Sequence, residues 1–261
     1  MEKNADCVIL YHKEVPYGIW DDEIWTPLEV GAAQREKVYD FGLRDNEGEN
    51  ISEWNAFYAE TTGIYWNWKH LTGQKYAGNC QYRRRLDVHK VEELDNMFKE
   101  HNVLAAAPVY LMQTVAQQYA SCHNPEDLPK IKQILLNLYP EYEKSWDSFI
   151  EYGHLLFYSN GFLMKEEEYD RYCKWLFSIL DEYKKELGCN TVEELDNEIT
   201  RQMKEGRRRD INSYGRTENA LQYQRQIGGF ASERLLTLYL LHNYQQDKIG
   251  VTQYLKMEDC F

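Results

Sequence analysis

The sequence predicts an α/β fold, a sheet covered by helices, from three observations. Short apolar runs at residues 7–11 and 103–108 have the length and composition of buried strands. Longer stretches carry the apolar spacing of helices, most clearly residues 166–187. The two patterns alternate along the 261 residues, and this alternation is typical of a sheet with helices packed on it.

The elements of the first half follow from local signals. Ser52 is a favoured helix-capping residue, and it predicts a helix over residues 52–71 that Thr72 and Gly73 interrupt. Pro108 ends an apolar strand, since proline removes a backbone donor. The expected order is therefore a strand at 7–11, the helix at 52–71, a strand at 76–82, a helix at 91–101 and a strand at 103–108.

The second half is predicted to be mainly helical, with helices at 125–138, 141–152, 166–187 and 228–243. Residues 155–164 predict a strand pair or one bent strand. From about residue 191 to 219 charged residues dominate, including the basic run 204–210. We expect a helical insertion or mobile loop there, within a single domain spanning 1–261. A basic run could contact lipid phosphates, but a solvated run of charges is the default.

Composition excludes several classes of function. A net charge of −13 disfavours nucleic-acid binding and strong adsorption to anionic lipid. No apolar run is long enough to span a membrane, and the first residues lack a signal-peptide pattern. The six cysteines show no CxxC spacing, which disfavours a zinc site. We therefore expect a cytoplasmic protein with reduced thiols, including Cys260.

Polar residues follow two of the predicted strands, where ligands of α/β sheets bind. His12 and Lys13 follow the first strand, and three arginines at 83–85 follow the second. Side chains alternate along a strand, so these three arginines cannot all face one way. If the chain turns at the strand end, two of them can converge on one ligand. A guanidinium matches phosphate oxygens in two hydrogen bonds. The alternative is a solvated edge that pairs with nearby acids.

An aromatic segment, residues 54–68, precedes those arginines, and the chain holds 21 Tyr and 7 Trp. Aromatic faces beside cations suit a ligand that joins a ring to an anion, such as a sugar on a diphosphate. We expect the segment to form a wall of the cleft. Trp66 and Trp68 cannot share one helix face, so one belongs to the core and Trp66 is the choice for the ligand side. Ordinary packing is the alternative for both.

Glu233 is the candidate general base, because it follows Gly228 and Gly229, a flexible entry that lets backbone approach a ligand. An ion pair with Arg234 or Arg225 is the alternative. If that holds, the base is sought among Glu60, Asp45 and Asp87. No GxGxxG, Walker, GxSxG or HExxH motif is present, and no Asp-x-Asp stands at a strand end. Arginine is therefore expected to balance a diphosphate without metal, so Mg²⁺ or Mn²⁺ is not favoured, nor is any tightly bound cofactor.

Six collinear runs resemble one family, the family called domain of unknown function 4422: residues 50–55, 65–69, 78–84, 159–164, 173–177 and 229–235. Its members resemble bacterial glycosyltransferases of capsule, exopolysaccharide and O-antigen assembly. The resemblance implies a glycosyltransferase-A-like mixed sheet covered by helices. This chain departs from the family pattern at Gln81, where a histidine is usual, and this leaves metal use and donor choice open.

The resemblance further implies a hexosyltransferase that takes a sugar from a UDP-sugar, galactofuranose with inversion being the best match. The acceptor would be a growing glycan on a polyprenyl diphosphate, reached by peripheral association with the inner membrane face. A non-catalytic carbohydrate-binding or scaffolding component of a polysaccharide synthesis complex is the alternative. The site residues expected are His12, Lys13, Arg83, Arg84, Asn50 and Asn55 for the donor, and Trp66, Asn160 and Arg225 for the sugar or acceptor.

Overall fold

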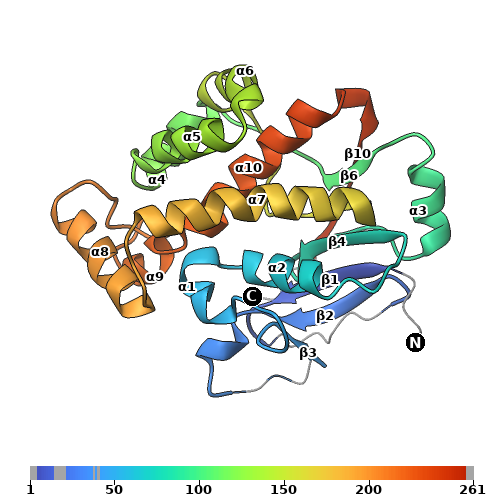
Figure 1. Ribbon diagram of the computed structural model, residues 1–261, viewed down its shortest axis with the longest axis horizontal. Helices are drawn as coiled ribbons and strands as arrows, with labels where there is room; N and C mark the ends of the chain where they lie inside the picture. The colour runs from blue at the N-terminus through green and yellow to red at the C-terminus, as the bar shows by residue number, and fades with distance from the viewer. Residues whose placement is uncertain (1–4, 15–21, 38, 40–41, 257–261) are drawn as a thin grey trace.

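The structure, a computed structural model, describes residues 5–14, 22–37, 39 and 42–256. Within these ranges the chain forms one large mixed sheet with helices packed on it, as the sequence predicts (Figure 1). The five described cysteines are free thiols, and Cys260 lies outside the described residues. No described helix combines the length and apolar composition that crossing a membrane requires.

The large sheet has the strand order β10-β6-β9-β4-β1-β2-β3, with β5 pairing to β4 and β11 pairing to β5. Strand β1 is parallel to β2 and β4, whereas β9 runs antiparallel between β4 and β6. Strands β7 and β8 form a separate pair. The strand bounds are β1 Asp6–Tyr11, β2 Trp25–Glu29, β3 Leu43–Arg44, β4 Tyr76–Gln81, β5 Arg84–Leu86, β6 Val103–Ala106, β7 Val109–Tyr110, β8 Leu155–Leu156, β9 Phe162–Lys165, β10 Ile249–Thr252 and β11 Tyr254–Lys256.

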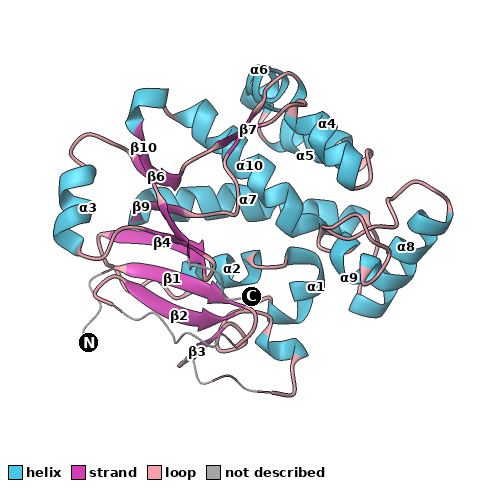
Figure 2. Ribbon diagram, turned by 180° about the vertical axis from the view of Figure 1, so that it is seen from behind, coloured by secondary structure: helices cyan, strands magenta, loops and turns pink. Residues whose placement is uncertain are grey.

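Both faces of the sheet are buried, which explains why β1 reads as a continuous apolar run. Val8 and Leu10 point into the larger core, and Cys7, Ile9 and Tyr11 point into a smaller core on the opposite face. Figure 2 shows strands β1, β2 and β4 in front of the helices, when the molecule is seen from behind. The helices of the larger core include α1 Asn55–Tyr58, α2 Thr61–Lys69, α7 Glu166–Glu186 and α10 Ile227–Asn243.

The remaining helices contribute to the two cores or pack against them. Helix α3 packs Leu94 against the smaller core. Helix α4 begins with a capping box, in which Thr114 accepts from the Gln117 backbone and the Gln117 side chain accepts from Thr114. The bounds are α3 Val91–Met97, α4 Val115–Cys122, α5 Asp127–Leu138, α6 Glu143–Trp146, α8 Val192–Lys204 and α9 Ala220–Gln224.

Two predicted elements differ from the structure. The helix expected over 52–71 is broken between α1 and α2, because Ala59 takes a positive φ of 50°. The expected strand pair or bent strand at 155–164 divides instead between β8 and β9, which belong to different sheets. Between them Ser159 and Asn160 also have positive φ, of 64° and 47°. Both departures are turns, and each lies at the cleft described below.

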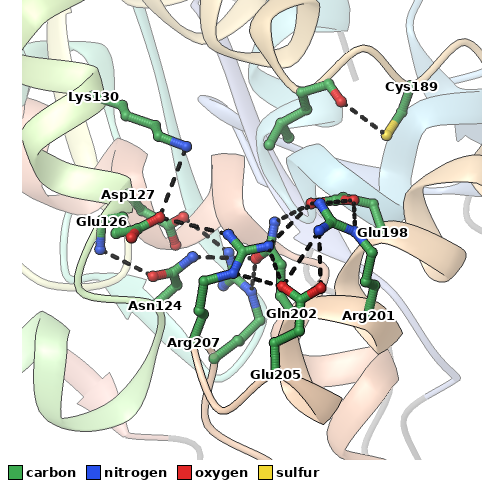
Figure 3. A network of polar contacts seen from close by, with 12 residues as sticks. Asn124, Glu126, Asp127, Lys130, Cys189, Glu198, Arg201, Gln202, Glu205 and Arg207 are labelled. Carbon is green, nitrogen blue, oxygen red and sulfur yellow. Dashed lines mark hydrogen bonds and ion pairs between the residues drawn. The ribbon is translucent and has the colours of Figure 1, made fainter.

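The segment from about residue 191 to 219 holds helix α8, followed by a loop that returns toward α9. The expectation of a solvated basic run there is wrong for Arg208, whose buried side chain pairs with Asp127 on α5 at 2.8 Å. Gln202 of α8 accepts from Arg208 and from Asn124, as part of the polar network in Figure 3. One residue of this charged segment, Arg208, is therefore buried and attaches the segment to the rest of the domain. We call its pair with Asp127 the anchor.

Gly228 and Gly229 lie inside α10, so the flexible entry expected there is wrong. A Cβ at Gly228 would come within 2.8 Å of the Phe57 ring, and one at Gly229 within 2.7 Å of the Ala59 Cβ. The two glycines allow α10 to pack closely on α1 and the turn after it. They therefore position Glu233 through helix packing rather than through backbone freedom.

Candidate active site

A cleft of about 820 Å³ opens at the carboxyl ends of β1 and β4, the edge where ligands bind in open α/β sheets. His12 follows β1, and Arg83 and Arg84 follow β4. The residues 59–60, between α1 and α2, and Glu233 of α10 contribute further lining groups. Loop and helix residues distant in sequence therefore meet at one strand edge, as the sequence analysis expected for His12 and the arginines.

The arginines form one wall of the cleft. The Arg84 guanidinium lies over the Tyr158 ring at 4.3 Å, and Arg83 lies over Tyr82 at 5.4 Å. These ring contacts restrict the guanidinium groups and leave their N–H edges for hydrogen bonds. Burial, with Arg83 and Arg35 adding to the effect, lowers the pKa of His12 to about 4. The wall thus carries arginine charges beside a neutral imidazole at pH 7.

Arg85 does not line the cleft that Arg83 and Arg84 line. Alternation in β5 separates Arg85 from Arg84, and Arg83 lies in the turn before the strand. It is 1% exposed and pairs with Asp22 at 2.9 Å. It also contacts His89, which bonds Asp22 at 3.0 Å. Two of the three arginines therefore reach the cleft, and the third is a structural cation under the sheet edge.

Two carboxylates lie on the floor of the cleft. Glu233 is 9% exposed and pairs with Arg234 at 2.8 Å, while its other oxygen accepts from the Ser159 backbone N–H at 2.8 Å. Glu60 accepts from the Asn160 amide at 3.1 Å and from the Gln81 amide. Burial and the charge of Glu233 raise the pKa of Glu60 to about 7. Burial also raises the pKa of Glu233, against the opposing effect of Arg234.

The Ser159–Asn160 turn joins these two carboxylates. Ser159 donates to Glu233 through its backbone, and the next residue, Asn160, donates to Glu60 and to Ser232 through its side chain. Both residues have left-handed backbone, which costs about 1 kcal/mol or more at a non-glycine residue. Asparagine tolerates it better than most, and a strained turn kept at a cleft is typical of functional sites.

Several predicted site residues lie elsewhere. Lys13 is exposed and does not line the cleft, and Asn50 forms a local turn by bonding Gly48 and Ser52. Arg225 pairs with Asp196 of α8 at 2.9 Å. Asn55 lines the cleft, but its amide bonds Ala59 and Thr62. Asn160 lies beneath the cleft, one hydrogen bond from Glu60.

The expectation that the 54–68 aromatic rings form the cleft wall is wrong. Trp66 is 7% exposed, stacks on His70 and donates to the Glu47 carbonyl. Trp68 stacks on Phe177 and donates to Asp170. Both indoles serve packing, because the helix that carries them lies over the sheet and not at its edge. The rings that do line the cleft come from other segments: Tyr82, Tyr158, Tyr214, Tyr223 and Phe230.

Of the alternative acids, Asp45 accepts from two backbone N–H groups, Ser52 and Thr62, which identifies it as a buried structural group. Asp87 is half exposed and bonds His89 at 3.0 Å. Glu60 alone of the three reaches the cleft. In sequence it is one acid in a helical pattern, and only the break at Ala59 turns it toward the strand edge.

In the described ranges no three His, Cys, Asp or Glu side chains are grouped so as to hold a metal ion. Among the described residues that line the cleft the acids are Glu60 and Glu233, whose oxygens already accept hydrogen bonds from protein groups.

Comparison with known proteins gives two similarities. The sequence profile of the family described as domain of unknown function (DUF4422) matches residues 6–205. Among solved structures, the apo form of WbbM, described as a bifunctional glycosyltransferase, is similar with a TM-score of 0.71 and 23% identity. The match covers 97% of this chain and 45% of that one, so the chain spans about half of the solved protein. At this identity the likeness is one of fold, and it agrees with the glycosyltransferase-A-like class expected. A search of curated proteins found no match.

Proposed function

The chain belongs to the DUF4422 family, and on that premise we propose that it is a glycosyltransferase using a nucleotide-diphosphate sugar. One observation carries the proposal. The cleft at the strand carboxyl ends sets Arg83 and Arg84 opposite two floor carboxylates, Glu60 and Glu233. Cations suit a departing diphosphate, and a carboxylate suits removal of a proton from an attacking hydroxyl.

In the proposed reaction an acceptor hydroxyl oxygen attacks the anomeric carbon of the donor. The bond from that carbon to the diphosphate breaks, and its electron pair leaves with the diphosphate. Negative charge grows on the departing oxygens, where Arg83 and Arg84 stabilise it. One of the two floor carboxylates takes the proton. Attack from the face opposite the leaving group inverts the anomeric centre.

We propose a UDP-sugar as donor, with galactofuranose as the best candidate, and a polyprenyl-diphosphate-linked surface glycan as acceptor. The family resemblance described above supports this choice of donor and acceptor, and the likeness of the fold to the glycosyltransferase WbbM supports sugar transfer in general. The tyrosines that line the cleft supply faces for sugar rings. The acceptor would be met at the inner face of the cell membrane, in the cytoplasm, by a peripherally bound protein.

Calorimetric titration with UDP, UDP-galactose and UDP-galactofuranose tests the donor. We expect UDP and at least one of its sugars to bind, and transfer from the bound donor to follow. Binding of glycans with no binding of any nucleotide would instead favour the alternative, a non-catalytic carbohydrate-binding component of a synthesis complex. Nucleotide binding in both Arg83→Ala and Arg84→Ala at parental affinity would contradict the arginine assignment.

We propose further that the arginines replace a divalent ion on the diphosphate. Mg²⁺ and Mn²⁺ prefer several carboxylate or carbonyl oxygens, and the donor wall presents mainly nitrogen donors. Transfer in excess EDTA should therefore stay within about threefold of the untreated rate. Loss of activity in EDTA that Mn²⁺ restores would show this part of the proposal to be wrong.

A further inference from the structure

We propose that Glu60, and not Glu233, accepts the proton of the attacking hydroxyl, while Glu233 is the fixed charge beside it. This assignment rests on the proposed transfer function and deepens it. The sequence alone favours Glu233, because Glu60 looks like one more acid in a helical segment. The contacts of the two side chains reverse that preference.

Glu233 is engaged on both oxygens by donors that favour its charged form. Arg234 Nη1 donates to Oε2 at 2.8 Å, and the Ser159 N–H donates to Oε1 at 2.8 Å. The Arg234 group is itself held by the Phe230 carbonyl at 2.9 Å and by Gln118. Protonation of a carboxylate paired with a buried arginine would leave the guanidinium unbalanced, so Arg234 opposes the rise that burial gives the Glu233 pKa. Glu233 is therefore a weak candidate for a base.

Glu60 has neutral partners instead. Its two oxygens accept from the amides of Gln81 and Asn160, which orient the carboxylate without supplying a compensating charge. Asn160 is held in turn by Ser232 at 2.8 Å and by Asn79, which donates to its carbonyl. Glu60 can thus gain or lose a proton while its orientation stays fixed, and this is what a general base requires.

The surroundings of Glu60 also have spare acceptor capacity. Within the described part of the chain, the Asn160 Oδ1 and Gln81 Oε1 atoms are buried without a hydrogen-bond partner. Buried amide oxygens normally find a donor. An acceptor sugar presents hydroxyl groups, and a hydroxyl entering beside Glu60 would supply the missing donor to Gln81, which lines the cleft. Asn160 is 1% exposed, which makes it a fixed part of the site.

The charged groups around Glu60 fit this role. Glu233 acts on it from α10 and Arg84 from β5, while Arg234, which also lines the cleft, pairs with Glu233. Burial and the Glu233 charge raise the Glu60 pKa to about 7, against the opposing effects of Asn160, Gln81 and Arg84. A base with a pKa near the working pH combines a usable ionised fraction with sufficient basicity. In the step, the hydroxyl proton moves to a Glu60 oxygen as the new carbon–oxygen bond forms.

The test compares Glu60→Gln and Glu233→Gln with the control Glu92→Gln, an exposed acid on α3. We expect Glu60→Gln to bind UDP within a few-fold of the parent and to lose transfer from UDP-galactofuranose by about a hundredfold or more. Glu233→Gln should retain more transfer, and the acid limb of its pH profile should move to lower pH, because a neighbouring negative charge is gone. Transfer by Glu60→Gln within a few-fold of the parent would overturn the assignment.

A measurement made without substrate tests the proposal independently of transfer activity. Carbon-13 NMR of labelled glutamate carboxyls should show a signal titrating near pH 7 that is missing in Glu60→Gln and shifted to lower pH in Glu233→Gln. A Glu60 signal titrating near its ordinary 4.5 would overturn the role. A parent protein that shows the expected titration but neither binds UDP nor transfers sugar would contradict the proposed function instead.

Discussion

Two buried polar networks in this molecule differ in their balance of charge. In the anchor of the 191–219 segment, Asp127 accepts from Arg208, Tyr119 and Tyr183, so one negative group meets one positive group and two hydroxyls. On the cleft floor, Glu233 pairs with Arg234, whereas Glu60 accepts from two neutral amides. The Arg84 charge acts on both carboxylates. The first network is neutral and saturated, whereas in the second the Glu60 carboxylate has neutral hydrogen-bond partners and lies beside the like charge of Glu233.

The difference separates a structural network from a functional one. A buried pair with matched charge and full hydrogen bonding gains from its surroundings, and removal of one partner leaves an uncompensated charge. A cluster of like charges costs stability, and it persists where the perturbed pKa has a use. The same burial therefore stabilises the fold at Asp127 and prepares a proton acceptor at Glu60.

The largest expected effect comes from a substitution that disrupts the charge-balanced network around Asp127. Asp127→Asn should lower the free energy of unfolding by about 3–5 kcal/mol, because Arg208 remains buried without its counter-charge. Urea unfolding followed by circular dichroism measures the change. The matched control is Glu182→Gln, which removes an exposed pair with Lys185 and should change stability by less than about 1 kcal/mol. A loss as small as that of the control at Asp127 would show that the anchor is not structural.

The next largest effect is expected when Arg84 and Arg85 are replaced separately and the activity and stability of the two variants are compared. Arg84→Ala should cost about 2–4 kcal/mol in transition-state stabilisation, since a cation on the leaving diphosphate is lost, and leave the melting temperature nearly unchanged. Arg85→Ala should do the reverse, because it removes the buried guanidinium that pairs with Asp22. Steady-state kinetics and thermal unfolding of both variants measure these two effects. Equal kinetic losses in the two would remove the distinction between cleft and structural arginine.

The smallest expected effect is on the way the stability of the protein depends on pH. The folded-state pKa of Glu60 is raised from 4.5 to about 7, so the parent loses stability as pH rises through that window. Glu60→Gln should therefore be more stable than the parent at pH 8, by up to about 3 kcal/mol, and equally stable at pH 4. Chemical unfolding at both pH values is the measurement. A variant less stable than the parent at pH 8 would contradict the unbalanced-charge interpretation.

What the sequence predicts well is local. The apolar run of β1 has one pattern because both sheet faces are buried, and the period of α7 is unambiguous. The opposite directions of Arg84 and Arg85 follow from side-chain alternation in β5, and Arg83 joins Arg84 because it lies in the turn before that strand. Each of these inferences depends only on residues that are close together in the sequence.

What the sequence does not predict depends on distant contacts. Glu60 reaches the cleft only because Ala59 takes a positive φ and because the Asn160 turn, a hundred residues later, meets it. The buried position of Arg208 depends on Asp127 in another helix. Trp66 belongs to the core because α2 packs over the sheet. No pattern within one segment carries this information.

Helix α10 has a consequence for the dynamics of the site. It is apolar on nearly every side and buried along most of its length, so its amide hydrogens should exchange with solvent only when the whole domain unfolds. The loop that brings Tyr214 to the cleft is largely exposed, and its amides should exchange by local opening. Glu233 and Ser232 thus belong to the part of the protein that opens most slowly, whereas the loop with Tyr214, at the rim of the cleft, opens more readily. Ligands can enter and leave through rim fluctuations while the acid pair on the floor keeps its geometry.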